Sequence, residues 1–275
     1  MIASFKYLDK PTPIHQLDPR TKIVLLLCTA FTAASVRDLR ALLVLLALAI
    51  VYYALAQIPW RETRAAWRFI IFFIVVLAGF NTLILGTGAV GQEAIVLLRL
   101  PLGIRITWQN IIESLGVICR MLAGAFMALP LTFTTLPTRF GVAFRGLGLN
   151  DKIAFAVDLA IRLVPTYAAD FRSTVDAQRA RGYEVDSLKG GFIERVRRLA
   201  PLAVPVTMNA IMSGEDITNA LDMRGFGLRP RTWIHARPLG LVDWALIAFG
   251  LGLLLGGIAW RIAGGGQIWV PPFPF

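Results

Sequence analysis

Charged residues are scarce in this chain of 275 residues: they make up only 16% of it. A soluble globular domain has about 25%. Hydrophobic residues account for 56%, and the mean hydropathy is +0.65. This composition indicates a protein that folds in a lipid bilayer. The net charge of +11 does not indicate nucleic-acid binding, because the basic residues lie mostly between apolar segments, as in the cytoplasmic loops of membrane proteins.

Residues that would support catalysis or cofactor binding are also missing. The two cysteines, Cys28 and Cys119, lie in apolar stretches and are expected to be small core residues, not a disulfide or a metal pair. The two histidines are far apart in sequence, and no HExxH, CxxC, GxSxG or phosphate-binding GxxxxGK[ST] motif occurs. We therefore expect no catalytic residue, no metal site and no cofactor.

Five apolar segments approach the roughly 20 residues that a transmembrane helix needs. They are residues 23–36, 41–58, 69–85, 111–133 and 241–260, of which the first is short. The first 20 residues are polar and contain proline, so we expect the first segment to stay in the membrane and not to be cleaved as a signal peptide. The sequence thus predicts an all-α integral membrane protein with about five transmembrane helices.

The segment between the fourth and fifth spans is different in kind. Residues 135–240 contain 15 Lys or Arg against 10 Asp or Glu, and no window of them is apolar enough to span a membrane. We therefore divide the chain into N-terminal transmembrane helices (1–134), a cytoplasmic region of long amphipathic helices (135–240), and a C-terminal transmembrane helix with a tail (241–275). With five spans, the N-terminus lies inside and the C-terminus outside. The positive-inside rule supports this orientation, which places Arg61, Arg64 and Arg68 on the inner side.

Apolar residues recur at helical spacing in this amphipathic region. The first helix is expected to begin at an N-cap, Asn150 or Asp151, and to end before Gly182, which can adopt the left-handed conformation. Two further amphipathic stretches cover residues 192–212 and 215–225. They are expected to lie at the boundary between membrane and cytoplasm.

Prolines interrupt two of these helices. Pro165 lies midway along the first, and Pro201 and Pro205 lie in the second. Because proline removes a backbone hydrogen bond, these positions are candidate hinges, although ordinary kinks fixed by packing explain them equally well. Asp158 and Arg162 are one turn apart and can form an ion pair.

Two of the predicted helices end in the same short pattern. An alanine, three residues, an arginine, a glycine and an aromatic residue follow one another in "AQRARGY" (177–183) and again in "ALDMRGF" (220–226). A single Arg-Gly pair is usually an ordinary helix cap. The repeat, however, places Arg181 and Arg224 each beside an aromatic residue at a helix end, as a docking tip whose guanidinium suits a carboxylate. Two such tips would suit two equivalent grooves on a dimeric partner.

The chain resembles the transmembrane T component of energy-coupling factor (ECF) transporters, the vitamin and metal-ion importers of the ABC class. The most specific similarity is "LAIRLVPTYAADFRSTVDAQRARG" (159–182) together with "NALDMRGFG" (219–227). Residues 15–23, 103–122 and 134–149 are also similar to segments of that family. Met223 departs from the pattern, because the family usually has alanine there.

This resemblance implies a non-catalytic transport subunit of the plasma membrane. It implies that Arg181 and Arg224 each dock in one of two cytoplasmic ABC ATPase subunits. The tips would be shaped by their neighbours, Ala180, Gly182, Met223 and Gly225. The amphipathic helices would hold a separate, membrane-embedded substrate-binding (S) subunit. They would pass the motion of the ATPases on to it for uptake of a vitamin, a related cofactor precursor or a metal ion.

Two other functional classes stay open. The first is a permease subunit of a conventional ABC importer, which would form the translocation path itself and carry one coupling helix. The second is a membrane enzyme or scaffold that needs no ATPase. The intramembrane residues Glu113 and Arg120 are functional candidates by default, yet snorkelling or a structural pair explains each of them better.

Overall fold

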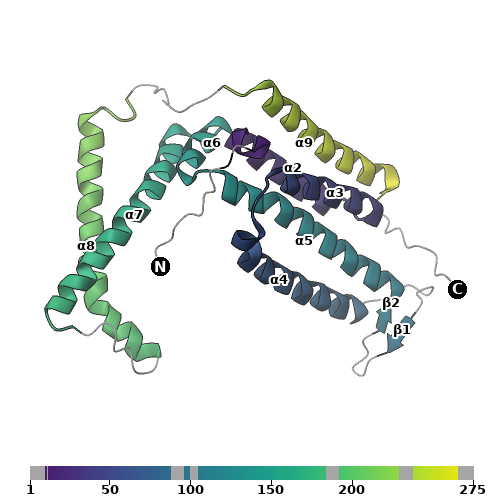
Figure 1. Ribbon diagram of the computed structural model, residues 1–275, viewed down its shortest axis with the longest axis horizontal. Coiled ribbons are helices and arrows are strands. Elements are labelled where there is room, and N and C mark those ends of the chain that lie inside the picture. The colour runs from purple at the N-terminus through teal and green to yellow at the C-terminus, as the bar shows by residue number, and fades with distance from the viewer. Residues whose placement is uncertain are drawn as a thin grey trace. The chain divides into compact units, whose positions relative to one another are not determined.

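The computed structural model describes residues 10, 12–87, 96–99, 105–183, 192–228 and 238–265, and the chain divides into two compact units. The membrane unit comprises the described residues of 6–136 and 237–275. The amphipathic unit comprises those of 137–236. Helices dominate both units (Figure 1), which confirms the predicted all-α class. The tail beyond residue 265 lies outside the described residues.

The five apolar segments all lie in helices of the membrane unit. In chain order the helices of this unit are α1 (Pro13–Gln16), α2 (Pro19–Ser35), α3 (Leu39–Leu55), α4 (Trp60–Thr87), α5 (Trp108–Thr134) and α9 (Leu241–Trp260), with a π-helical turn η2 at Arg261–Gly265. Among the described residues, three stretches are long and apolar enough to cross a membrane, namely Trp60–Thr82, Trp108–Thr134 and Leu241–Ala263. Helices α2 and α3 have 17 residues each. That length corresponds to about 26 Å, slightly less than the roughly 30 Å of a hydrocarbon core.

A small hairpin between α4 and α5 was not predicted. Strands β1 (Val96–Arg99) and β2 (Arg105–Thr107) pair antiparallel, with Val96 opposite Thr107 and Leu98 opposite Ile106. Runs of three or four residues carry too little periodicity to be recognised from sequence. Thr107 then caps α5, because its hydroxyl accepts a hydrogen bond from the Asn110 N–H at 3.3 Å.

Helix α5 is the centre of the membrane unit, and it packs against α2, α3 and α4 (Figure 1). Both predicted core cysteines are buried and free; Cys119 on α5 packs with Leu42 and Leu45 of α3. Trp67 of α4 packs with Leu129 and Phe133 of α5 in a second buried cluster. The apolar segments therefore form one packed bundle.

Two cations, the buried Lys22 and the half-buried Arg120, hold α2 and α5 together at opposite ends of α2. On α5, Arg120 donates from Nε to the carbonyl of Ala33 at 2.9 Å and from Nη2 to that of Val36 at 3.0 Å, which caps the end of α2. On α2, the ammonium of Lys22 donates to the carbonyl of Thr134 at 3.0 Å, which caps the end of α5. Each cation neutralises the partial negative charge of a helix C-terminus. Arg120 thus has a structural role, which is one of the two explanations that the sequence favoured. Its partners are backbone carbonyls and not a charged side chain.

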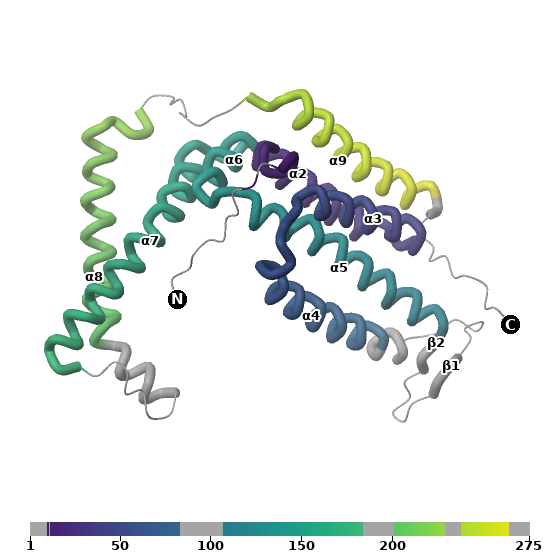
Figure 2. Tube along the Cα trace, viewed as in Figure 1, coloured from purple at the N-terminus to yellow at the C-terminus, as the bar shows by residue number. Residues whose placement is uncertain are grey.

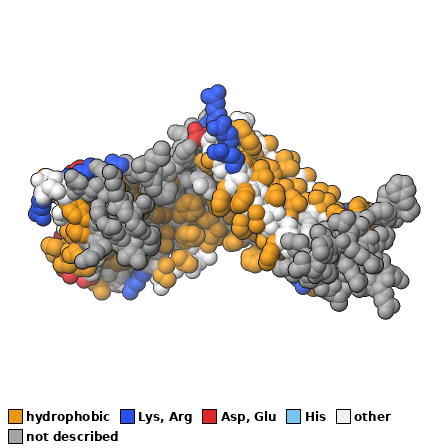
Figure 3. Space-filling view, turned by 90° about the horizontal axis from the view of Figure 1, so that it is seen from below, with side chains coloured by type: hydrophobic (Ala, Val, Ile, Leu, Met, Phe, Trp, Pro, Cys, Tyr) orange, Lys and Arg blue, Asp and Glu red, His pale blue; other side chains and the backbone are white. Residues whose placement is uncertain are grey.

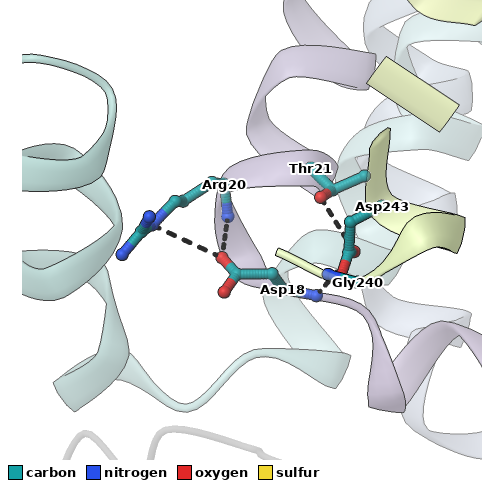
Figure 4. A network of polar contacts seen from close by, with 5 residues as sticks. All are labelled: Asp18, Arg20, Thr21, Gly240 and Asp243. Carbon is teal, nitrogen blue, oxygen red and sulfur yellow. Dashed lines mark hydrogen bonds and ion pairs between the residues drawn. The ribbon is translucent and has the colours of Figure 1, made fainter. Parts of the chain in front are cut away.

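Helix α9 packs along α2, and a polar network joins the first turns of the two helices (Figure 4). Asp243 accepts hydrogen bonds from the backbone N–H groups of Gly240 and Asp18 and from the hydroxyl of Thr21, at 3.1, 3.2 and 2.9 Å. Farther along, glycines allow close approach. A Cβ on Gly250 would lie 3.1 Å from Leu25, and one on Gly257 would lie 2.9 Å from Thr32. Small residues at such an interface bring two membrane helices together.

The amphipathic unit contains a 3-10 turn and three helices. They are η1 (Pro137–Arg139), α6 (Phe140–Gly146), α7 (Asp151–Ala180) and α8 (Phe192–Met223). Helix α6 packs tightly on α7, because a Cβ on Gly141 would lie 2.6 Å from the Cβ of Asp158. The predicted pair of Asp158 with Arg162 is confirmed, with 3.0 Å between Oδ2 and Nη2.

The prediction of two separate helices over 192–212 and 215–225 was wrong. Helix α8 runs without interruption from Phe192 to Met223 and includes Gly214. Glycine inside a helix costs only about 1 kcal/mol relative to alanine, so an isolated glycine does not end a helix that is otherwise well formed.

Candidate docking site

The first Arg-Gly pattern forms a regular helix end. Helix α7 starts at the predicted N-cap, Asn150, whose side chain accepts from the Lys152 N–H at 3.1 Å, and its C-cap is Arg181. Gly182 has φ +84°, the left-handed conformation that glycine adopts without strain. Its N–H donates to the Arg179 carbonyl at 2.9 Å, and the Tyr183 N–H donates to the Gln178 carbonyl at 3.0 Å. This pair of bonds is a Schellman motif.

The second pattern has the same backbone geometry. Gly225 has φ +63°, and its N–H donates to the Asp222 carbonyl at 2.9 Å. The Phe226 N–H donates to the Leu221 carbonyl at 3.0 Å. Arginine, glycine and the aromatic residue thus occupy equivalent places in both motifs, so the sequence repeat is also a structural repeat.

The side chains at both ends are accessible. Ala180, Arg181 and Gly182 are exposed, and a Cβ on Gly182 would meet nothing within 4 Å. Arg224 is exposed as well, and Met223 has 84% of its surface exposed. Each end therefore presents a guanidinium whose planar donors can bind a carboxylate or a line of carbonyl oxygens. Met223 makes the second end bulkier and more apolar than the first, where Ala180 stands.

The two Arg-Gly ends lie at opposite ends of α7. The first terminates α7 itself, and the second, which terminates α8, lies beside the start of α7. The ring of Phe226 packs 4.5 Å from that of Phe155, near the start of α7, and a Cβ on Gly227 would lie 3.4 Å from Lys152. Arg181, in contrast, ends the same helix. The roughly 26 residues from Phe155 to Arg181 correspond to about 40 Å of helix. Helices α7 and α8 contact each other, and the chain trace shows the last turn of α8 leading back toward the first turns of α7 (Figure 2).

The residues that fix the second end, Lys152 and Phe155, were not predicted as part of the site. They lie about 70 positions before Phe226, and no sequence signal at that spacing indicates the contact. The candidate hinge prolines lie inside continuous helices: Pro165 in α7, and Pro201 and Pro205 in α8. Their role as hinges stays a prediction.

An apolar helical bundle and a separate amphipathic unit with two exposed arginine ends define this chain as a helical membrane protein. Known families support this class. Residues 10–234 match the model of the CbiQ family, described as cobalt transport protein. The chain therefore belongs to the CbiQ family of transport proteins, and the predicted membership of the ECF T components is confirmed.

Individual relatives agree with this assignment. The energy-coupling factor transporter transmembrane protein EcfT of Limosilactobacillus fermentum is 26% identical over 234 residues, which cover 82% of this chain and 84% of that protein. EcfT of Heliobacterium modesticaldum is 25% identical over 271 residues, covering 94% and 97%. A putative ABC transporter ATP-binding protein of Bifidobacterium longum is 28% identical over 230 residues, which cover 80% of this chain but only 28% of that protein.

Proposed function

We propose that this chain is the coupling subunit of an ECF-type importer, and that Arg181 and Arg224 dock in two ABC ATPase subunits. The observation that carries the proposal is the pair of equivalent helix ends, each with an exposed arginine and a Schellman cap, about 40 Å apart along α7. Two ends at that separation suit two ATPase subunits better than one. The name of the Bifidobacterium longum relative, an ABC transporter ATP-binding protein, supports partners of this kind.

The coupling subunit also needs a surface for the substrate-binding subunit. Large apolar side chains are exposed on both long helices: Ile153, Val164 and Phe171 on α7, and Val204, Met208, Ile211 and Met212 on α8. Exposed apolar surface of this extent marks an interface with protein or membrane. We propose that it holds a small membrane-embedded S subunit, which carries a vitamin, a cofactor precursor or a metal ion. The amphipathic unit lies in the cytoplasm, with the N-terminus inside and the C-terminus outside.

Helices α7 and α8 connect the two docking ends in this proposal. ATP-driven closure of the ATPases moves Arg181 and Arg224 toward each other, and α7 and α8 pass that movement to the S subunit. Pro165, Pro201 and Pro205 are the proposed bend points, because each lacks the N–H that would continue the helical hydrogen bonds.

The docking role is tested by coexpressing the chain with candidate ATPases and purifying through a tag on this chain. We expect two ATPase subunits to be recovered with the wild type and lost with the double variant Arg181→Glu/Arg224→Glu. A matched control, Arg139→Glu/Arg172→Glu, makes the same charge change at exposed arginines of the same unit and should retain them. Equal recovery from the two double variants would contradict the proposal.

A measurement of membrane insertion distinguishes a docking role of the two arginines from a role in folding. Because both arginines are exposed at helix ends, the variants should insert as well as the wild type while transport falls. Failure of either single variant to insert would instead make that arginine a folding determinant.

A further inference from the structure

Three arginines form a stripe on the first turns of α4. Arg61, Arg64 and Arg68 are all exposed. At 3.6 residues per turn they lie within about a quarter of the helix circumference. Thr63 and Trp67, on another side of the same turns, are buried against the bundle. The arginine stripe therefore points away from the membrane unit.

No carboxylate of the described chain neutralises this stripe. None of the ion pairs among described residues includes one of the three arginines. Three unneutralised positive charges on one face repel one another, so the stripe fits an anionic partner.

The same face becomes apolar immediately after the last arginine. Phe69, Phe72 and Val75 are 71%, 67% and 63% exposed, and the described surface over α4 and α5 is mainly hydrophobic when seen from below (Figure 3). Trp60, at the start of the helix, is 60% exposed. Tryptophan gathers at the level of lipid headgroups, and exposed phenylalanine and valine suit acyl chains. Along this face the arginines thus come first and the apolar side chains follow.

We infer that the arginine stripe of α4 is a binding site for anionic phospholipids. The phosphate groups bind the guanidinium groups of Arg61, Arg64 and Arg68, and the acyl chains lie along Phe72 and Val75. An acidic protein would match the charge, but it would not match the apolar face that follows without a break. The site is independent of the docking ends Arg181 and Arg224, which belong to the other unit.

Lipid binding is measured by native mass spectrometry of the full chain, with whatever subunits it copurifies with, titrated with phosphatidylglycerol or phosphatidylcholine. We expect the wild type to retain phosphatidylglycerol preferentially. Each basic residue near an anionic surface strengthens binding about fivefold, so Arg64→Gln/Arg68→Gln should weaken retention by roughly 30-fold. The variant Arg64→Lys/Arg68→Lys keeps the charge and should retain most of the preference.

The matched control is Arg37→Gln/Arg40→Gln, which removes two exposed arginines of the same unit, one between α2 and α3 and one in the first turn of α3. It should leave retention unchanged. Unaltered binding in the Arg64→Gln/Arg68→Gln variant, or an equal loss in the control, would overturn the inference. Loss of a copurifying protein with phosphatidylglycerol retained would make the stripe a protein interface and would also overturn it. If the double variant does not fold, the single variants decide, with about a fivefold loss expected from each.

Discussion

Two neighbouring glycines of α9 allow a paired test of how closely α9 packs on α2. A Cβ on Gly257 would lie 2.9 Å from Cγ2 of Thr32 and 3.4 Å from Cγ2 of Val36, whereas a Cβ on Gly256 would meet nothing within 4 Å. Nonbonded carbon atoms prefer separations of about 3.5–4.0 Å. We therefore expect Gly257→Ala to destabilise the contact between the two helices and Gly256→Ala to leave it intact.

The size of the difference follows from these distances. Replacing glycine by alanine inside a helix gains about 1 kcal/mol at either position. At Gly257 the added carbon overlaps Thr32, and overpacking of this kind costs about 1–3 kcal/mol. Since the helix-propensity gain is common to both variants, their free energies of unfolding should differ by about 1–3 kcal/mol. In a chain of roughly this size, 1 kcal/mol shifts Tm by about 2–4 °C, so Gly257→Ala should melt about 2–12 °C below Gly256→Ala.

The chain contains its own reporters for this measurement. Cys28 and Cys119 are buried, so a thiol-reactive fluorophore labels them only as the membrane unit unfolds. Cys28 lies one turn before Thr32 on α2, close to the expected overlap. Thermal unfolding of the purified variants in detergent, followed by this fluorescence, gives the two Tm values directly.

A second substitution identifies the atom responsible. Thr32→Ser removes Cγ2 but keeps the hydroxyl, which donates to the Cys28 carbonyl at 2.7 Å. In the Thr32→Ser background, Gly257→Ala should no longer lower Tm. Equal Tm values for Gly256→Ala and Gly257→Ala, or a Gly257→Ala defect of the same size in the Thr32→Ser background, would refute the close packing of α9 on α2 at this point.

The two cations that cap helix ends in the membrane unit, Arg120 and Lys22, give further predictions. Arg120→Met leaves the carbonyls of Ala33 and Val36 without their charged donor. The free energy of unfolding should therefore fall by about 3 kcal/mol, measured as a lower Tm. Arg40→Gln, at an exposed position, should change the Tm little. Lys22→Met should lower the free energy of unfolding by about 2–3 kcal/mol for the same reason. The hydroxyl of Thr134 accepts a hydrogen bond from Lys22 at 2.9 Å. Thr134→Val should therefore lower the free energy of unfolding less in the Lys22→Met background than in the wild type. Additive effects of Lys22→Met and Thr134→Val would contradict the hydrogen bond between these two side chains.

Much of the local structure could be predicted from the sequence. Apolar runs located the five long helices of the membrane unit, and Asn150 and Gly182 marked the two ends of α7. These signals act within a few residues, through periodicity and capping. The same local rules misplaced the break at Gly214, because packing and neighbouring residues override the weak helix propensity of one glycine.

The site was predicted only in part, for the same reason. The sequence identified Arg181 and Arg224 as a pair, since both follow one pattern of residue types. It could not show that the second end lies beside the start of α7, which depends on the contact of Phe226 with Phe155. Nor could it indicate the arginine stripe as a separate surface, because exposure and the absence of carboxylate partners among the described residues depend on which side of α4 is buried.

By itself, then, the sequence determined that this is a helical membrane protein, where most of its long helices lie, and which two helix ends share one pattern of residues. The tertiary structure decided how the helices pair and which charges they bury. Arg120 caps the end of α2 although 84 positions separate it from Val36, and Asp243 joins α9 to Thr21 across 222 positions. Such contacts depend on three-dimensional packing, in which each buried polar group must find a partner wherever the fold supplies one, and no local pattern in the chain encodes that choice.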